Sequence, residues 1–215
     1  MIKLVIFDLD GTLADTIDDL AGAVNRALAR RGFPTHEPGA YKLMVGNGFR
    51  NLVIRALPEA YRSDALVEEF RAEAVADYEK HCLDLTRPYE GVPELLDSLA
   101  SRNLSLAILS NKPHAQTLKV TSGLFPATRF HIIRGETSEF PRKPDPSSAL
   151  DIARRLDTLP SESAYLGDSD VDMRTARAAG MLALGAGWGF RGAAELAEAG
   201  AFAVLDAPGQ MLRYI

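Results

Sequence analysis

The fold is constrained most by a series of short apolar runs that alternate with helical patterns along the chain. The runs cover residues 2–7, 104–109, 130–134, 163–167, 181–185 and 202–206. Because nearly every position in them is apolar, they are typical of strands buried on both faces, as in a parallel sheet covered by helices. The alternation predicts an α/β fold built on a doubly wound parallel sheet.

Helical patterns fill the segments between these runs. One opens after Gly91, and a second is predicted to have Asp145 as its N-cap and Pro146 as its first helical residue. A third, over residues 169–180, ends at Gly180, a residue type favoured just after a helix.

Residues 16–82 do not follow the alternation. Ile17, Leu20, Val24 and Leu28 share one face of a helix, and segments 49–57 and 65–81 also have helical patterns. We therefore predict a small helical cap at 16–82, inserted after the first strand of an α/β core formed by 1–15 and 83–215.

Composition narrows the function. The chain has 215 residues, of which 47% are hydrophobic, and its net charge of −5 offers no electrostatic footprint for nucleic acid. No apolar run approaches the roughly 20 residues that span a bilayer. Cys82 is the only cysteine, which excludes an intrachain disulfide and a multi-cysteine zinc site. We expect a cytoplasmic protein with no nucleic-acid or membrane partner, either a monomer or a homodimer.

Polar side chains gather where the predicted strands end, which is where ligands bind in open parallel α/β sheets. They are Asp8, Asp10 and Thr12 after the first run, Ser110 and Asn111 after the second, Lys143 in a later loop, and Asp168, Asp170 and Asp172 after the fourth. Helices follow Ser110, Lys143 and Asp168, and helix N-termini favour anions such as phosphate.

The acidic residues at these ends need a compensating charge. Asp8 and Asp10 project to one side of an extended chain, and with one or two further carboxylates they would repel strongly at neutral pH. Either their pKa values rise or a cation neutralises them, and an all-oxygen ligand set favours Mg²⁺. With Lys143 and the Ser110 hydroxyl opposite the metal, the set is suited to phosphoryl transfer. A carboxylate can be the nucleophile, and a second can protonate the leaving oxygen and then deprotonate water.

Four motifs in this order resemble those of the haloacid dehalogenase superfamily of phosphohydrolases. They are "DLDGT" (8–12), "LSN" with Ser110, "RKP" with Lys143, and "GDSDVD" (167–172). The resemblance covers the whole chain and implies a Rossmann-like core with a helical cap after the first strand. It implies Asp8 as the nucleophile and Asp10 as the general acid/base. Hydrolytic dehalogenases of the family lack the second aspartate, so Asp10 favours phosphate chemistry.

The same resemblance implies a metal site. Asp8, the backbone carbonyl of Asp10, and Asp168 would hold Mg²⁺. Asp172 would orient the metal's ligand shell, directly or through water, whereas Asp170 has no assigned role.

Substrate contacts are expected from both parts of the chain. The phosphate-binding residues are expected to be Thr12, Ser110, Asn111 and Lys143. In the cap, "MVGNGFRNLVIRAL" (44–57) is similar to a segment of bacterial phosphoglycolate phosphatases, and "SNK" (110–112) and "GAGWGF" (185–190) resemble segments of the same subgroup. Gly46 and Gly48, on either side of Asn47, allow a tight turn whose N–H groups can approach an anion. Arg50 is a candidate contact to a substrate carboxylate.

The sequence therefore predicts a Mg²⁺-dependent phosphatase for a small phosphorylated metabolite, with 2-phosphoglycolate as the expected substrate. Four alternatives remain open. They are a phosphatase for a sugar phosphate or pyrophosphate, a sugar phosphomutase similar to β-phosphoglucomutase, a phosphorylatable receiver-type signalling domain, and a catalytically inactive binding module.

Overall fold

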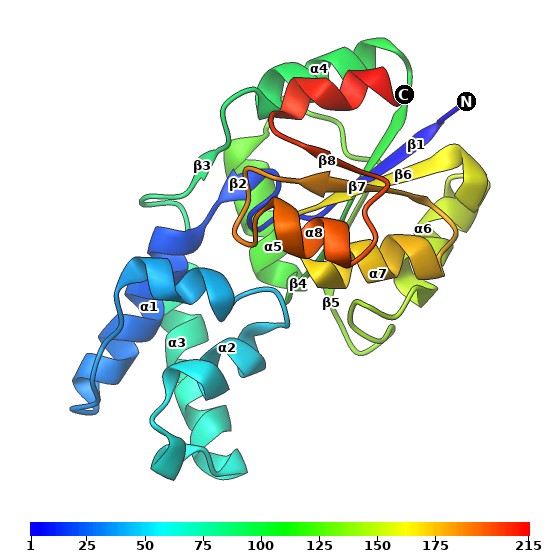
Figure 1. The fold of residues 1–215 in the computed structure, drawn as a ribbon. Helices are drawn as coiled ribbons and strands as arrows, with labels where there is room; N and C mark the ends of the chain where they lie inside the picture. Colours follow the sequence, from blue (N-terminus) through cyan, green and yellow to red (C-terminus); the bar gives the residue numbers. More distant parts are fainter.

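A six-stranded parallel sheet forms the centre of the computed structural model, which describes residues 1–215 (Figure 1). Its strand order is β5-β4-β1-β6-β7-β8, so β1 lies between the two halves of the sheet. The strands are β1 (Leu4–Phe7), β4 (Ser105–Pro113), β5 (Ile132–Glu136), β6 (Ser163–Gly167), β7 (Leu182–Ala186) and β8 (Ala203–Leu205). This order confirms the predicted doubly wound α/β fold, and it places the carboxyl ends of β1, β4 and β6 side by side.

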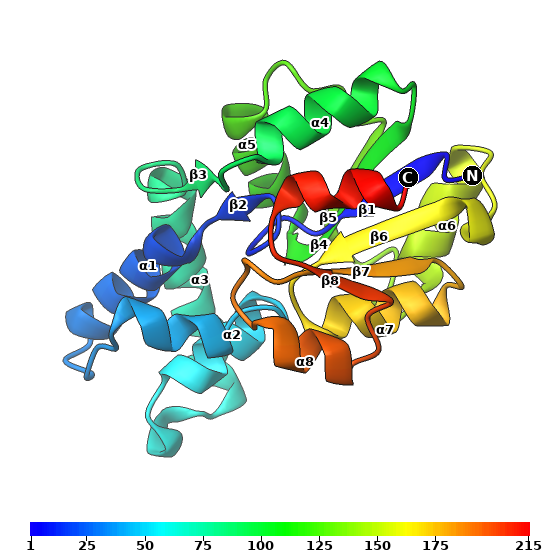
Figure 2. The same cartoon turned by 45° about the horizontal axis from the view of Figure 1, so that its top comes forward.

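Alternate residues of β1 belong to two apolar layers. Val5 and Phe7 pack into the larger core cluster, with side chains of α4 (Val92–Ser101) and α5 (His114–Leu124). Leu4 and Ile6 pack into the second cluster, with α6 (Ser147–Arg155), α7 (Asp170–Ala178) and α8 (Ala193–Glu198). Because successive strand side chains point to opposite faces, a continuous apolar run supplies both layers. Figure 2 shows the sheet between these two groups of helices.

The predicted elements agree with the structure to within a few residues, with small differences at their ends. The helix expected to start at Pro146 begins at Ser147, and Pro146 takes the N-cap position predicted for Asp145. Asp145 still accepts a hydrogen bond from the Ser147 N–H at 2.9 Å, so its polar role is kept one residue outside the helix. Helix α8 has six residues, too few to give a readable period, and the sequence did not predict it.

Residues 16–82 form three helices beside the sheet, α1 (Ile17–Arg30), α2 (Phe49–Ala56) and α3 (Asp64–His81) (Figure 1). Two short strands, β2 (Ala14–Asp15) and β3 (Arg87–Pro88), pair antiparallel where the chain passes to and from these helices. The larger apolar cluster includes both Phe7 of the sheet and Phe70 of α3. Because one apolar cluster joins the sheet to these helices, the division into a core (1–15 and 83–215) and a cap (16–82) stays a prediction.

None of the helices is both long enough and apolar enough to cross a lipid bilayer.

Candidate active site

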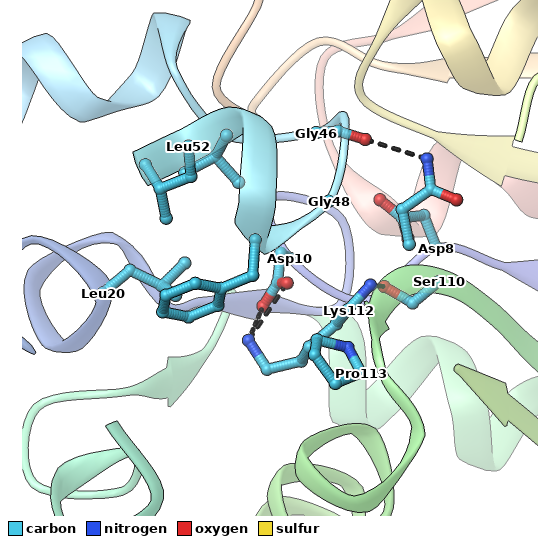
Figure 3. A pocket seen from close by; sticks show the side chains of 12 residues that line it. Asp8, Asp10, Leu20, Gly46, Gly48, Leu52, Ser110, Lys112 and Pro113 are labelled. Carbon is cyan, nitrogen blue, oxygen red and sulfur yellow. Dashed lines mark hydrogen bonds and ion pairs between the residues drawn. The ribbon is translucent and has the colours of Figure 1, made fainter. Parts of the chain in front are cut away.

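Most of the predicted site residues meet at the carboxyl edge of the sheet, beside the helices of the 16–82 segment; Arg50 does not. A pocket there opens to solvent and is lined from both parts of the chain (Figure 3). Asp8 and Asp10 follow β1, and Ser110 and Asn111 lie in the last part of β4. Side chains that are 100 residues apart in the sequence therefore share one wall because β1 and β4 are adjacent, parallel strands.

Lys143 joins two of the carboxylates. Its Nζ lies 2.8 Å from Asp8 Oδ1 and 2.7 Å from Asp172 Oδ1, and only 3% of its side chain is exposed. Burial alone would lower the pKa of Lys143, but Asp172 and Asp8 outweigh it and hold this pKa well above its usual value. The ammonium is therefore a fixed positive charge beside the predicted nucleophile.

Three buried carboxylates form a candidate metal centre. Asp8, Asp168 and Asp172 each place an oxygen within 4.8 Å of the others. Burial, together with repulsion from Asp172 and Asp10, raises the pKa of Asp8 to about 7 despite the neighbouring Lys143. Burial, Asp172 and Asp8 likewise raise the pKa of Asp168 well above its usual value. The cluster is short of positive charge, and its hard oxygen donors fit a divalent cation.

The loops around Asp168 leave no room for larger residues. Asp168 Oδ2 accepts a hydrogen bond from the Phe190 N–H at 2.7 Å. A Cβ atom on Gly11 or Gly189 would collide with the Asp168 side chain, and Gly11 also has a φ of +86°. The glycine of "DLDGT" is therefore needed both for its backbone conformation and for the close approach of this carboxylate.

Asp172 is fully buried and its carboxylate is hydrogen-bonded on both oxygens. Oδ2 accepts from the Ser169 N–H at 3.1 Å and the Ser169 hydroxyl at 2.6 Å, which completes a capping box at the start of α7. Asp170 lies outside the cluster and pairs with Arg174 at 2.5 Å. Asp170, which had no assigned role, is therefore not among the clustered carboxylates.

Asp10 points into the pocket and is held by two donors. Lys112 Nζ lies 2.8 Å from Asp10 Oδ1 and 3.1 Å from Oδ2 (Figure 3). The Thr16 hydroxyl donates to Asp10 Oδ1 at 2.8 Å. The Lys112 ammonium also sits 4.4 Å from the centre of the Tyr78 ring. Lys112 lies in the "SNK" segment, but the sequence does not predict its contact with Asp10, because a lysine two residues beyond a serine carries no spacing signal.

The other predicted phosphate ligands differ in the hydrogen bonds that their side chains already make. Ser110 lines the pocket, and its hydroxyl accepts only a long hydrogen bond of 3.3 Å from the Lys112 N–H. Thr12 is fully buried and its hydroxyl lies 3.5 Å from Asp168 Oδ1. The Asn111 side chain accepts from the Lys143 N–H at 2.9 Å and donates to the Lys143 carbonyl at 3.1 Å, so it positions the Lys143 loop.

The predicted cap turn reaches the pocket, and three core side chains bind its carbonyl groups. Arg191 donates to the Val45 carbonyl at 3.0 Å, Asn111 to Gly46 at 3.0 Å, and Arg142 to Asn47 at 3.4 Å. Gly46 and Gly48 line the pocket and both have positive φ, as the tight turn requires. We call this contact between the core and the Val45–Asn47 carbonyls the cap latch.

Arg50 is not brought to the pocket. Its guanidinium lies 2.5 Å from Asp64 and 2.9 Å from Glu68, on the outside of α2 and α3. Arg50 is the second residue of α2. Its side chain points away from the face of the helix from which Phe49 and Leu52 line the pocket. The structure therefore gives no support to Arg50 as a contact for the substrate carboxylate.

Comparisons with known proteins agree with this geometry. Residues 5–186 match the family model described as haloacid dehalogenase-like hydrolase. A phosphoglycolate phosphatase of Chromobacterium violaceum is 35% identical over 198 residues, which cover 91% of this chain and 89% of that protein. One of Pseudomonas putida is 36% identical over 193 residues, covering 87% of this chain and 70% of that protein. A crystal structure from Lactobacillus delbrueckii subsp. bulgaricus, provisionally classed as a phosphoglycolate phosphatase, has a TM-score of 0.92 at 29% identity, covering 99% of this chain and 98% of that one.

Proposed function

The chain belongs to the haloacid dehalogenase-like hydrolases and is a phosphoric monoester hydrolase, and we propose that its substrate is 2-phosphoglycolate. The observation that carries the substrate is the 35% identity, over nine-tenths of this chain, to a phosphatase named for that compound.

The apolar lining of the pocket also argues against a sugar phosphate. Its cap side presents the apolar side chains of Leu20, Val45, Phe49 and Leu52. Hydroxyl groups of a sugar ring would lose their hydrogen bonds to water against these side chains and find few replacements. This argues against the phosphomutase and sugar-phosphatase alternatives. Membership of the hydrolase family argues against the receiver domain and the inactive binding module.

The first step uses Asp8 and Asp10. An Asp8 carboxylate oxygen attacks phosphorus and forms an aspartyl-phosphate, and the bond between phosphorus and the ester oxygen breaks. Asp10, on the same pocket wall, gives its proton to that ester oxygen, which leaves as the alcohol. Lys143 and the Ser110 hydroxyl hold the phosphoryl oxygens during the transfer.

The second step restores the enzyme. Asp10 takes a proton from water as the water oxygen attacks phosphorus, and the bond to the Asp8 oxygen breaks. Inorganic phosphate leaves, Asp8 is again a carboxylate, and Asp10 is again protonated. The apolar cap side of the pocket keeps other water away from the aspartyl-phosphate in the meantime.

We assign the metal as Mg²⁺, held by Asp8 and Asp168, with Asp172 orienting the shell. A bound Mg²⁺ would neutralise charge on the phosphoryl oxygens. Support comes from the three clustered carboxylates, their buried setting and the raised pKa values of Asp8 and Asp168. The backbone carbonyl of Asp10 remains the proposed third protein ligand.

Residues 16–82 are proposed to act as a cap that moves on the β2–β3 hinge. Both passages between the core and the helices run through this two-stranded ribbon. Two short strands are easier to bend than a packed sheet, so motion is expected to concentrate there.

Phosphate release tests the substrate assignment. We would measure kcat/KM with Mg²⁺ for 2-phosphoglycolate, pyrophosphate, β-glucose-1-phosphate and several sugar phosphates. We expect 2-phosphoglycolate to be preferred clearly. An equal or higher value for a sugar phosphate or pyrophosphate would overturn the substrate, while leaving the phosphatase chemistry in place.

A further inference from the structure

The pocket has one cation on its wall that the reaction, as written, does not use. Lys112 lines the pocket, and only 2% of its side chain is exposed. Its ammonium contacts both oxygens of Asp10 and lies over the Tyr78 ring. A buried lysine whose only charged partner is a residue that must exchange protons has a function beyond filling space.

Other cations near the site are already engaged elsewhere. Lys143 lies between Asp8 and Asp172, at the phosphoryl end of the pocket. Arg50 pairs with acids on the outer surface of the helices, and Arg191 donates to the Val45 carbonyl. None of these three is among the residues that line the pocket beside Asp10, whereas Lys112 is.

Lys112 lies close to where the leaving group of the substrate is expected to bind. Asp10 is proposed to protonate the ester oxygen, and Lys112 Nζ is within 3.1 Å of both Asp10 oxygens. Two covalent bonds join the ester oxygen of an α-phosphorylated acid to its carboxylate carbon, which puts a carboxylate oxygen roughly 3 Å from the ester oxygen. A carboxylate next to the ester therefore falls within reach of this ammonium.

The surroundings leave a carboxylate few other partners. The cap side of the pocket is apolar, with Leu20, Phe49 and Leu52, and the remaining side-chain charges on the wall are those of Asp8 and Asp10. A carboxylate buried there without a cation would be repelled and poorly solvated. The same carboxylate beside Lys112 would form a charge-assisted hydrogen bond.

We propose that Lys112, seated on the Tyr78 ring, is the residue that selects phosphate monoesters bearing a carboxylate on the carbon next to the ester oxygen. This inference rests on the proposed function and deepens it, because it assigns recognition of the acid to the core rather than to Arg50 of the cap. Binding of the substrate then moves the ammonium from Asp10 to the substrate carboxylate.

A matched pair of substrates tests the assignment. 2-Phosphoglycolate and 2-hydroxyethyl phosphate have leaving groups of similar size, and only the first is an acid. We would measure kcat/KM for both with wild type, Lys112→Met and Lys112→Gln. We expect each variant to lower the preference for 2-phosphoglycolate by about tenfold to a hundredfold, the ratio that corresponds to one hydrogen bond to a charged group.

Thr16→Val is the control for the contact with Asp10. It removes the other donor to Asp10 and keeps the Lys112 charge. We expect Thr16→Val to slow both substrates by the same factor and to leave their ratio unchanged. If both Lys112 variants did the same as Thr16→Val, Lys112 would only position Asp10, and the inference would be wrong.

The experiment distinguishes a failure of the role proposed for Lys112 from a failure of the proposed function. A wild-type enzyme with no preference for 2-phosphoglycolate over 2-hydroxyethyl phosphate would overturn the substrate assignment, and the role of Lys112 with it. A wild-type preference that survives in both Lys112 variants would overturn the role of Lys112 alone. Hydrolysis of acetyl phosphate by each variant shows that it is folded and active, because this substrate has a good leaving group and carries no carboxylate.

Discussion

In the α/β core, the charged side chains of the site are buried at strand ends and bond to one another, whereas nearly all charged side chains of α1, α2 and α3 lie at or near the surface. The exception is Asp19 of α1, which is buried and accepts hydrogen bonds from Thr86. Lys143 and Lys112 have 3% and 2% of their side chains exposed, and both contact carboxylates of the site. The helices instead carry external pairs such as Arg26 with Asp77 and Arg31 with Glu73. Toward the pocket they present apolar side chains and the backbone of a glycine turn.

This difference separates two tasks. Buried ion pairs are costly to form and to break, so they fix the geometry of the chemistry and tolerate little change. Apolar side chains limit the size of what can enter and desolvate it, but they cannot choose between an acid and an alcohol. The core should therefore set the reaction and the charge of the substrate, and the cap should set its size.

Replacing the nucleophile tests the core most severely. We expect Asp8→Asn to abolish turnover, because an amide is not a usable nucleophile. Phosphate release measured over long incubations should stay below about 1% of wild type. Asp170→Asn is the matched control, since Asp170 is an aspartate at the same edge of the sheet that pairs only with Arg174, and it should keep wild-type activity. Activity of Asp8→Asn above that level would remove Asp8 from its role.

Replacing the acid/base should have a smaller effect. We expect Asp10→Asn to slow turnover by about 10²- to 10⁴-fold, which is the usual loss on removing a general acid/base. The loss should be smaller for acetyl phosphate, whose leaving group needs no proton in the first step. An unchanged rate with 2-phosphoglycolate would mean that another group moves the proton.

Metal affinity should depend on pH. Because the pKa of Asp8 is raised to about 7 and that of Asp168 is raised as well, protons compete with Mg²⁺ for these oxygens at neutral pH. The deprotonated form binds metal, so affinity should rise with pH, on the order of tenfold per pH unit for each proton displaced. Calorimetric titration with MgCl₂ at several pH values checks this, together with proton release into the buffer. A constant affinity across neutral pH would contradict the metal cluster.

The cap latch should affect binding more than chemistry. Arg191→Met removes the donor to the Val45 carbonyl and leaves every charged contact of the catalytic cluster in place. We expect KM for 2-phosphoglycolate to rise by up to about tenfold with little change in kcat, as for the loss of one hydrogen bond. Arg174→Met, on an exposed pair of the core, is the control. A fall in kcat with KM unchanged would show that Arg191 acts on the reacting groups.

Arg50→Met should change least. Exposed ion pairs contribute about 0–1 kcal/mol to stability, and the guanidinium of Arg50 does not face the pocket. KM and kcat for 2-phosphoglycolate should therefore stay within about twofold of wild type. A large rise in KM limited to acidic substrates would transfer carboxylate recognition from the core to the cap.

The sequence predicts the position of a site residue best where that residue lies at the end of a strand. Asp8, Asp10 and Asp168 could be placed because parallel strands put their carboxyl ends at one edge, whatever the distance along the chain. Asp170 and Asp172 lie two residues apart in a helix, and the sequence alone could not show that Asp172 faces the cluster while Asp170 pairs outward.

Contacts between the core and the cap could not be predicted in this way. Arg50 was expected at the substrate because it follows the glycine turn, but the direction of a helical side chain depends on how the helix is rotated against its neighbours. Lys112 and Arg191 gave no signal because each depends on a partner more than 100 residues away. Such pairs are fixed by tertiary packing, for which a single sequence has no period or spacing.

Detection of phosphorylated Asp8 would test the central claim most directly. Asp10→Asn would be mixed with acetyl phosphate and Mg²⁺, quenched in acid and digested for mass spectrometry. Acetyl phosphate needs little help to leave, whereas hydrolysis of the aspartyl-phosphate needs the missing base, so the intermediate should accumulate. We expect one phosphoryl group on the peptide that contains residues 4–15, at Asp8. Release of phosphate without any phosphorylated peptide, or a phosphoryl group on another residue, would contradict the assignment of Asp8 as the nucleophile.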